Sequence, residues 1–312
     1  MRAVVIDTIT PAEEIMLTEV PVPAVRPGLV LVKVKAFGLN HSEQILRHEE
    51  INAAYIRKPV IPGIECVGEV VDPSDTRFIK GQRVCALMGG MGRSFNGSYA
   101  EYALLPEHHV FAMETDLPWV AAGAVPETYF TAWGSLFECL RLKADDTLLV
   151  RGGTCALGCK VIATTHRETK LSLLSNAGAS VCMIDDGILT GKLRGITKAL
   201  DLVGPRNLAD TLTAVEKGAI VCSTGILGGV YTLNGFDPIK DIPNGVYLTG
   251  FFSNYPSQEI MDDIFGFLHA HKLTPCCGSV FDFENIRDAI LAQDGKKADG
   301  KIVVSVGTES EI

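Results

Sequence analysis

The feature that most constrains this chain is a glycine-rich turn between two apolar runs, in the stretch LLVRGGTCALGCKVIATT (Leu148–Thr165). An apolar run, a glycine-rich turn and a second apolar run are typical of the start of a nucleotide-binding strand–turn–helix–strand unit. The pyrophosphate of a dinucleotide binds on such a turn because glycines let the backbone approach and free N–H groups point at the anion. The stretch therefore predicts an α/β domain with a dinucleotide site.

Length and charge narrow the class of protein further. A chain of 312 residues with 47% hydrophobic and 21% charged residues has material for two globular domains. The net charge of −9, without a basic tract, argues against a nucleic-acid or anionic-membrane surface. No apolar run is long enough to span a bilayer, and the N-terminus lacks the apolar region of a signal peptide. We expect a cytoplasmic protein without membrane contact.

The nine cysteines do not form a recognisable ligand or disulfide pattern. Their number is odd, they are scattered, and no C-x-x-C pair is present. Most lie within apolar runs, which favours buried reduced thiols in a cytosolic protein. We interpret the adjacent pair Cys276–Cys277 as structural.

The first 120 residues or so have the pattern of a β-rich domain. Proline and glycine turn signals separate the short β-rich runs, and this favours a partly open barrel whose loops carry chemistry. The alternation in LVLVKVKA predicts a strand with one buried face. The runs are Arg2–Ile6, Leu29–Ala36, Gly68–Val71 and Arg83–Ala86.

From about residue 121 helical and strand patterns alternate, which predicts a doubly wound parallel sheet. One helix is expected over Thr131–Leu142, with Trp133, Leu136, Phe137 and Leu140 on one face. Another, Glu259–His271, leads back to a β-rich tail. We therefore expect a nucleotide-binding domain, residues 123–271, inserted into a discontinuous catalytic domain, residues 1–122 and 272–312. The expected strands are Leu148–Val150, Val161–Thr164, Val181–Ile184, Ala199–Val203, Ala219–Cys222 and Val246–Thr249.

A set of motifs in a fixed order resembles the medium-chain dehydrogenase/reductase superfamily, in its zinc-independent quinone oxidoreductase-like branch. The resemblance covers nearly the whole chain and implies a GroES-like β-rich domain enclosing a Rossmann domain. The motifs are EVPVPAVRPGLVLVKVKAFGLNHSE (Glu19–Glu43), IPGIECVGEVV (Ile61–Val71), NGSYAEY (Asn96–Tyr102), PETYFTAW (Pro126–Trp133), LDLVG (Leu200–Gly204) and GKIVVSV (Gly300–Val306).

The resemblance also allows a test for zinc. Zinc-dependent relatives take ligands from a cysteine and a histidine at the positions of Asn40 and Ile64. An amide is a poor zinc ligand and isoleucine is none, so no catalytic zinc is expected. The loop after Cys85 lacks the four cysteines of a structural zinc lobe. For Glu65 we expect a structural role.

Without zinc, the expected reaction is hydride transfer to a quinone, an enone or a related activated carbonyl compound, which disperses the developing charge itself. The predicted catalytic residues are Asn40, Tyr129 and Thr131. Asn40 is suited to donate to a substrate carbonyl or to hold the nicotinamide ribose; a turn-capping role is the alternative. Tyr129 and Thr131 resemble positions that face the nicotinamide. Their alternatives are a buried core ring, which we favour for Tyr129, and a helix N-cap for Thr131.

The expected cofactor is NADP(H). The second Rossmann strand ends without the Asp or Glu that would bind a ribose 2′-hydroxyl, and hydroxyl and cationic groups follow instead. A solvated basic loop is the alternative interpretation. The predicted cofactor-binding residues are Gly152, Gly153, Thr154, Cys155, Ala156, Leu157, Gly158, Thr165, Arg167, Lys170, Gly204, Gly225, Phe251, Phe252 and Ser253.

The spacing after the glycine-rich turn departs from the family. Only nine residues, Arg151 to Cys159, separate the two apolar runs. A crossover helix that returns along a five-residue strand needs roughly 11 residues beyond the turn. Either the printed sequence is a shortened version of a longer parent, or the first crossover helix is missing. In the second case we expect altered local topology and severely weakened cofactor binding.

Two classes of function follow. The first is an NADPH-dependent, zinc-independent quinone or enone reductase. The second is a protein that retains the fold but has impaired cofactor binding and a non-catalytic role. A zinc-free alcohol or aldehyde reductase is a third possibility. The substrate is expected to be small, uncharged and electron-poor. The resemblance suggests a homodimer through edge strands of the nucleotide domain. From the residues themselves, we interpret Ile220–Val230 as an edge strand.

Overall fold

The computed structural model describes residues 1–152, 159–295 and 300–307. The chain divides into two compact units. Unit 1 comprises Met1–Phe130 and Ser253–Ile312, and unit 2 comprises Thr131–Phe252. Each unit has its own sheet and its own core, so each is described separately.

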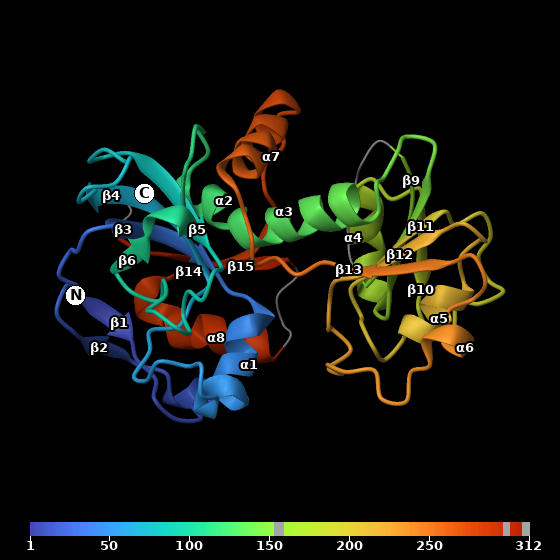
Figure 1. Cartoon of the computed structure of the whole chain (residues 1–312), viewed down its shortest axis with the longest axis horizontal. Coiled ribbons are helices and arrows are strands. Elements are labelled where there is room, and N and C mark those ends of the chain that lie inside the picture. The colour runs from blue at the N-terminus through green and yellow to red at the C-terminus, as the bar shows by residue number, and fades with distance from the viewer. Residues whose placement is uncertain (153–158, 296–299, 308–312) are drawn as a thin grey trace. The chain divides into compact units, whose positions relative to one another are not determined.

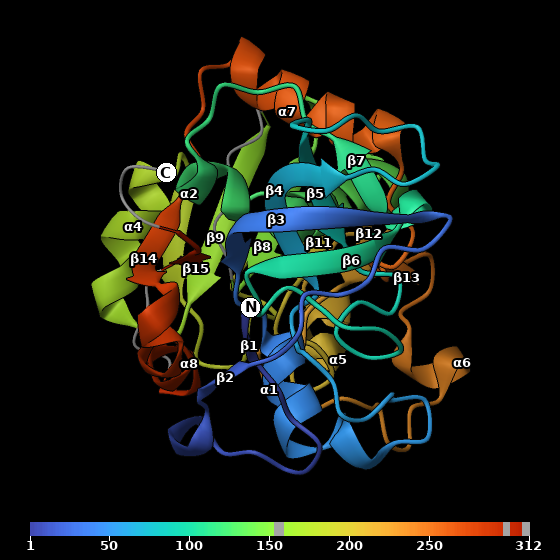
Figure 2. The ribbon, with the colours of Figure 1, turned by 90° about the vertical axis from the view of Figure 1, so that its left-hand side faces the viewer.

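Unit 1 is built around a seven-stranded, mainly antiparallel sheet in the order β14–β15–β3–β4–β5–β7, with β6 also paired to β3 (Figures 1 and 2). Only β14 and β15 run parallel. This is the GroES-like, partly open barrel that the turn-separated β-rich runs predict. Its strands are β3 (Leu29–Gly38), β4 (Glu65–Asp72), β5 (Arg83–Leu87), β6 (Tyr102–Pro106), β7 (Val110–Ala112), β14 (Cys277–Asp282) and β15 (Lys301–Ser305).

Further short elements complete unit 1. A two-stranded antiparallel sheet is formed within the first 19 residues. It consists of β1 (Arg2–Val4) and β2 (Leu17–Glu19). The helices are α1 (His41–His48), α2 (Trp119–Gly123), α7 (Gln258–Ala270) and α8 (Ile286–Asp294), with single turns at Ala12–Glu14, Glu50–Asn52, Glu107–His109 and Phe283–Asn285.

One face of the central strand β3, formed by Val30, Val32, Val34 and Ala36, is at most 1% exposed, as the alternation predicts. The opposite face is not open to solvent: Leu29 and Lys33 are half-buried, and Leu31 and Lys35 are buried. Three strands, β4, β6 and β15, pair with β3. Lys35 is only 6% exposed and reaches the Glu69 carboxylate at 3.6 Å. The alternating lysines suggested that one face of β3 is exposed to solvent, but the long apolar stems of lysine side chains can also pack on a buried face.

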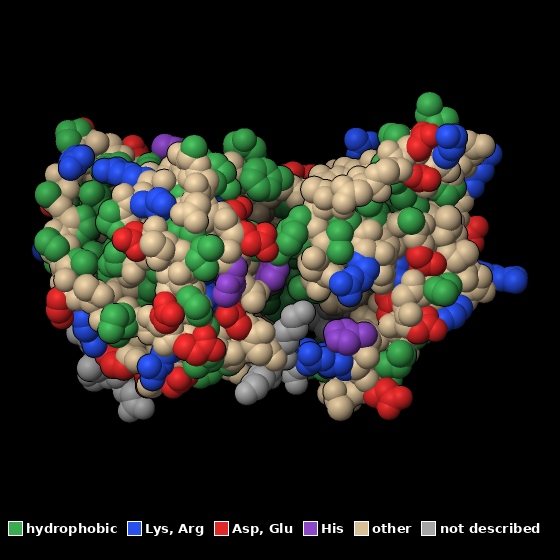
Figure 3. Space-filling view, turned by 90° about the horizontal axis from the view of Figure 1, so that it is seen from below, with side chains coloured by type: hydrophobic (Ala, Val, Ile, Leu, Met, Phe, Trp, Pro, Cys, Tyr) green, Lys and Arg blue, Asp and Glu red, His purple; other side chains and the backbone are tan. Residues whose placement is uncertain are grey.

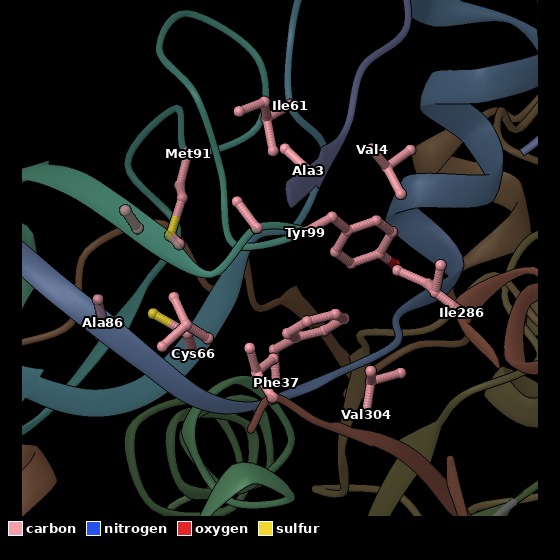
Figure 4. Close-up of a cluster of buried hydrophobic side chains, with 14 of the residues drawn as sticks. Ala3, Val4, Phe37, Ile61, Cys66, Ala86, Met91, Tyr99, Ile286 and Val304 are labelled. Carbon is pink, nitrogen blue, oxygen red and sulfur yellow. The ribbon is translucent and has the colours of Figure 1, made fainter. Parts of the chain in front are cut away.

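The core of unit 1 unites residues from both ends of the chain. The rings of Phe37 and Tyr99 stack with centroids 4.8 Å apart, and Ile286 and Val304 from the C-terminal segment lie around them (Figure 4). These four residues are at most 1% exposed. The C-terminal strands therefore belong to the same core as the first residues of the chain.

Unit 2 is a six-stranded, all-parallel sheet in the order β10–β9–β8–β11–β12–β13. The order reverses between β8 and β11, as in a Rossmann domain. β12 lies inside the sheet, so the prediction of an edge strand at 220–230 was wrong; β13 is the edge. The strands are β8 (Thr147–Arg151), β9 (Lys160–Thr165), β10 (Val181–Ile184), β11 (Lys198–Asp201), β12 (Ile220–Ser223) and β13 (Tyr247–Gly250). The connecting helices are α4 (Leu171–Asn176), α5 (Leu208–Thr213) and α6 (Pro238–Asp241), with a single turn at Glu168–Lys170.

The helix expected from Thr131 begins earlier and changes pitch. α3 (Pro126–Trp133) is α-helical, and Gly134–Cys139 continues as a π-helix. The wider turn rotates the later side chains around the axis. Leu136 and Leu140 are buried, whereas Phe137 is 40% exposed and packs on Trp133. The predicted apolar face is therefore divided.

The strands β8 and β9 run parallel and in register, with Thr147 opposite Lys160 and Arg151 opposite Thr164. Eight residues, 152–159, join them. The altered topology expected for a missing crossover helix is therefore not found. These eight residues are nevertheless fewer than a crossover helix needs to return along a five-residue strand.

No helix in the described part of the chain is long and apolar enough to cross a membrane. On the face drawn in Figure 3, Lys and Arg side chains are interspersed with Asp and Glu side chains and form no continuous basic area.

Candidate active site

The motif positions of unit 1 converge on a buried ion pair. Lys301, the first residue of β15, places Nζ 2.6 Å from Oε1 of Glu65, the first residue of β4. The same ammonium donates to Oδ1 of Asn40 at 2.5 Å. Asn40 in turn donates through Nδ2 to Glu65 Oε1 at 2.7 Å. The side chain of Glu65 is fully buried and that of Lys301 is 10% exposed, so the three groups form one enclosed triad.

Local backbone geometry holds this triad in place. Asn40 precedes α1, and its backbone N–H donates to Glu43 Oε2 at 2.8 Å, which fixes the start of the helix. The other oxygen of Glu43 accepts from the backbone N–H of Ile64 at 3.0 Å. Burial, the largest effect, raises the pKa of the Glu43 carboxyl, although the Ile64 N–H and the charge of Lys301 lower it. Glu43 thereby links α1 to the segment that precedes β4.

The start of α3 closes the other side of Glu65. The backbone N–H of Glu127 donates to Glu65 Oε2 at 2.8 Å, so each oxygen of Glu65 has a partner. Oε1 of Glu127 accepts from Ser253 Oγ at 2.7 Å. Ser253, predicted to bind cofactor, is a buried residue tied to α3 in this structure. Its neighbour Asn254 accepts from the backbone N–H of Gly89 at 3.2 Å.

Tyr129 and Thr131, the other predicted catalytic residues, lie within α3. Tyr129 is half-buried, so the interpretation as a buried core ring was wrong. Thr131 is five residues into the helix that begins at Pro126, so it is not an N-cap. The carbonyl of Thr131 accepts from Ser135 Oγ at 2.7 Å. Neither residue belongs to the triad of Asn40, Glu65 and Lys301.

The donor set of unit 1 does not fit a catalytic zinc ion. Asn40 Oδ1 and Glu65 Oε1 both face an ammonium group, and Ile64 offers no ligand atom. The second oxygen of Glu65 is already hydrogen-bonded to a backbone N–H. Within residues 1–152, 159–295 and 300–307, no group of three or more His, Cys, Asp or Glu side chains is arranged to hold a metal. These donor atoms are therefore already engaged and do not form a zinc site.

Unit 2 carries a second buried cation, at the end of β8 beside the glycine-rich turn. Arg151 is 0% exposed and forms a bidentate pair with Asp185, at 2.7 and 3.0 Å. Its Nη1 donates to Asp210 Oδ2 at 2.8 Å and to Thr211 Oγ1 at 2.9 Å. Burial raises the pKa of Asp185, but the hydrogen bonds from Arg151 and from the Gly187 N–H outweigh it and hold the pKa below its ordinary value. We call Arg151, Asp185, Asp210 and Thr211 the arginine cluster.

The predicted 2′-phosphate site lies at the end of β9. Thr165 is 8% exposed, and its Oγ1 accepts from the backbone N–H of Arg167 at 3.2 Å. Arg167 and Lys170 are half-buried and follow within five residues. At the end of the neighbouring strand β10, the carboxylate of Asp185 is paired with Arg151. The described end of β9 thus brings together hydroxyl and cationic groups.

Two of the predicted glycines approach other backbone segments of unit 2. A Cβ on Gly204 would overlap the carbonyl oxygen of Gly225, and a Cβ on Gly225 would overlap the carbonyl oxygen of Leu202. Tight packing between the loops after β11 and β12 therefore accounts for both glycines. Gly152, with φ +87°, directly follows Arg151.

The remaining predicted positions are divided. Phe251 packs its ring on Gly134, where a Cβ would overlap it, while Phe252 is 70% exposed. Six predicted residues lie outside the described part of the chain. They are Gly153, Thr154, Cys155, Ala156, Leu157 and Gly158.

The cysteines are less uniformly buried than expected. Cys66, Cys85 and Cys222 are buried, whereas Cys276 is exposed. Burial raises the pKa of Cys66 to about 12 and that of Cys222 to about 11, so these thiols stay protonated at neutral pH.

The fold and the two sites define a class, a two-domain dehydrogenase with a GroES-like domain and a Rossmann domain. Residues 26–115 match the family "Alcohol dehydrogenase GroES-like domain", and residues 183–304 match the family "Zinc-binding dehydrogenase". The chain is similar to the crystal structure of an NAD-dependent alcohol dehydrogenase, with a TM-score of 0.85, 24% identity and coverage of 98% of this chain and 100% of that one.

Sequence comparison places the chain more narrowly. It is 27% identical over 314 residues to quinone oxidoreductase of Homo sapiens, with 92% of each chain covered. It is 28% identical over 257 residues to the putative quinone oxidoreductase YhfP of Bacillus subtilis (strain 168), with 74% of this chain and 75% of the relative covered. The protein belongs to the medium-chain dehydrogenase/reductase superfamily, in its quinone oxidoreductase-like branch, and is an oxidoreductase.

Sequence reasoning did not identify Lys301, Glu43 or Arg151 as members of buried polar clusters. Lys301 stands in the motif GKIVVSV, and Arg151 is the last residue of β8, directly before the glycine-rich turn. A charged residue at the end of a buried strand was the available signal in both cases. Glu65 lies 236 residues before Lys301 in the chain, and Asp185 lies 34 residues after Arg151. Sequence spacing alone therefore did not reveal these pairs.

Proposed function

We propose that this protein is a zinc-independent, NADPH-dependent reductase that transfers hydride to a quinone, an enone or a related activated carbonyl compound. The observation that carries the proposal is the triad of unit 1. Its ammonium group is bonded to both Asn40 and Glu65. The resemblance implies that zinc-dependent relatives carry a metal ligand at the position of Asn40, so this set of groups supports a reaction without zinc. Membership in the quinone oxidoreductase-like branch supports the same reaction class.

The preference for NADPH rests on unit 2. Thr165, Arg167 and Lys170 present a hydroxyl and two cations at the end of β9, where an NAD-selective site would carry a carboxylate. A 2′-phosphate is an anion that such groups bind well. When bound, the reduced nicotinamide supplies the hydride. We further propose that residues 123–271 bind the nucleotide and that residues 1–122 and 272–312 bind the substrate. The same proposal includes a homodimer.

The chain's own groups would assist the reaction by binding and orientation. Hydride addition to a conjugated acceptor moves negative charge onto its carbonyl oxygen, and a preorganised N–H donor stabilises that charge. Asn40 has its Oδ1 bonded to Lys301 and its Nδ2 bonded to Glu65, so its amide orientation is fixed. Water supplies the proton that completes the reduction.

NADPH and NADH binding by this chain, followed by fluorescence titration, tests the cofactor. We expect tighter binding of NADPH, and we expect the double variant Arg167→Ala/Lys170→Ala to lose NADPH affinity at least tenfold with little change for NADH. The variant Lys192→Ala, an exposed cation elsewhere in unit 2, serves as the charge control. Equal affinity of the wild type for both dinucleotides contradicts the preference for NADPH.

A second candidate function rests on the short link between β8 and β9. Residues 152–159 are too few for the crossover helix whose N-terminus binds pyrophosphate in this fold. A protein that keeps the fold, binds NADPH weakly and acts without catalysis is the alternative. NADPH oxidation with a panel of small quinones separates the two. Absence of turnover together with a cooperative thermal melt favours the non-catalytic protein.

A further inference from the structure

Lys301 is positioned to do more than neutralise Glu65. Its ammonium carries three N–H groups, and the structure gives two acceptors among the described residues, Glu65 Oε1 and Asn40 Oδ1. Glu65 is fully buried, whereas the Lys301 side chain keeps 10% of its surface exposed. The ammonium therefore has one more N–H group than the acceptors that the described residues give it.

The backbone around Lys301 leaves space for this arrangement. Gly38 is the last residue of β3, and a Cβ there would overlap both Lys301 Cε and Glu65 Oε1. The positions 38, 40, 65 and 301 come from three strand ends and the start of one helix. Such convergence at strand ends is typical of sites rather than of cores, where side chains from strand centres pack.

Stability alone is a poor reason for a buried ion pair. Removing two charges from water costs about as much as their attraction returns, and apolar replacements are often neutral or stabilising. A lysine that is enclosed, oriented by an amide and a carboxylate, and still able to donate matches the requirement for a preorganised electrophile.

We propose that Lys301 is the catalytic electrophile, with its free N–H bound to the carbonyl oxygen of the substrate. The inference rests on the proposed reductase function. Hydride adds to the electron-poor carbon of an enone, a C–H bond forms, and the C=C electron pair shifts toward oxygen to give an enolate. The nicotinamide is oxidised, and the substrate is reduced by two electrons. The Lys301 ammonium stabilises the enolate oxygen, and water protonates the α-carbon. Asn40 and Glu65 act as positioning residues.

The first test uses the full chain and the variants Lys301→Met, Lys301→Arg and Lys35→Met. Lys35 is a matched control because it is also buried and paired with a carboxylate, Glu69, in unit 1. Steady-state NADPH oxidation with a small enone is expected to lose about 10²–10³-fold in kcat for Lys301→Met. Lys301→Arg, which keeps the charge, is expected to retain more activity than Lys301→Met, and Lys35→Met to keep the wild-type kcat.

The second test does not depend on turnover. 4-Nitrophenolate is an oxyanion whose absorbance changes when it leaves water, and it serves as an enolate mimic. The wild type is expected to bind it at least tenfold more tightly than Lys301→Met. NADPH affinity, measured by fluorescence, is expected to be equal in the two proteins.

The outcomes separate the two proposals. Wild-type turnover that persists in a folded Lys301→Met variant overturns the role of Lys301 and leaves the reductase function intact. A loss of NADPH affinity that equals the loss of kcat/KM makes Lys301 a cofactor anchor and overturns the inference. A wild type without turnover overturns the reductase function and this role with it. If Lys301→Met does not fold, the variant Glu65→Gln/Lys301→Met removes both charges, and full activity in it contradicts the proposal.

Discussion

Arg151 in unit 2 and Lys301 in unit 1 are cations at strand ends, and the two cations are held differently. Arg151 in unit 2 makes five hydrogen bonds, to two carboxylates, a hydroxyl and a carbonyl, through all three of its nitrogens. Among the described residues, Lys301 in unit 1 has one carboxylate oxygen and one amide oxygen as partners. The guanidinium is fully enclosed, whereas the ammonium side chain is partly exposed.

This difference in hydrogen-bond partners distinguishes a cation that stabilises the fold from one that is available to bind a substrate. A planar guanidinium satisfied on every nitrogen ties β8, the end of β10 and α5 together and leaves little donor capacity. An ammonium with an incomplete set of acceptors accepts a further ligand at low cost. The arginine cluster should therefore govern the stability of unit 2, and Lys301 should govern activity.

The largest expected effect comes from Arg151→Met. The variant leaves two carboxylates without their cation and is expected to lower the free energy of unfolding of unit 2 by about 3–5 kcal/mol. The chain has two tryptophans, Trp119 in unit 1 and Trp133 in unit 2, so single-tryptophan variants report each unit in urea titrations. Unfolding of unit 1, followed through Trp119, should change little. An unchanged midpoint at Trp133 would contradict the role of the arginine cluster.

The variant Gly38→Ala tests how tightly Lys301 and Glu65 are packed in unit 1. The new methyl group must displace Lys301 or Glu65, and overpacking of this kind costs about 1–3 kcal/mol. The urea midpoint reported by Trp119 is expected to fall. Gly266→Ala in α7 is the matched control, because nothing lies within 4 Å of its added Cβ and alanine favours the helix by about 1 kcal/mol. Equal changes in the two variants would show that the triad does not require Gly38.

The pH dependence of unit 2 should follow Asp185 and Asp210. For Asp210, burial raises the pKa, but the N–H of Leu189, the Thr190 hydroxyl and N–H, and the charge of Arg151 together hold it below its ordinary value. Carboxyls with a depressed folded-state pKa stabilise the fold above their unfolded pKa, about 3.9, and lose that contribution as pH falls through the folded value. The stability difference between wild type and Arg151→Met should therefore be largest above about pH 5 and narrow below about pH 4. Urea titrations at pH 7, 5, 4 and 3 measure it; a constant difference would indicate that the carboxylates are not the partners that matter.

The smallest effect is expected for an exposed ion pair between a cation and an aspartate in unit 2. Lys192 and Asp186 lie 2.7 Å apart, but their side chains are 41% and 61% exposed. Lys192→Ala should change the free energy of unfolding by less than about 1 kcal/mol, because water and salt screen the attraction. Trp133 fluorescence in urea checks it. A loss as large as that of Arg151→Met would mean that burial is not what distinguishes the arginine cluster.

Much of the architecture could be predicted from the sequence. Period-two and buried-strand runs indicated the strands of both sheets, and the ordered motifs indicated the superfamily. The boundary errors have local causes. The π-helical turn at Gly134–Cys139 divided the predicted apolar face, and Lys35, on the face of β3 expected to be exposed, is buried.

By itself, the sequence determined the two-sheet organisation and the replacement of the expected zinc ligands by Asn40 and Ile64, because both depend on residue type and local spacing. Only the tertiary structure showed which group Asn40 and Glu65 bind. Lys301 meets Glu65 and Asn40 because β15 returns to pair with β3, which brings together residues more than 230 positions apart. It likewise showed that β9 joins β8 in parallel across eight residues, since the register of a ladder depends on backbone partners that no single segment encodes.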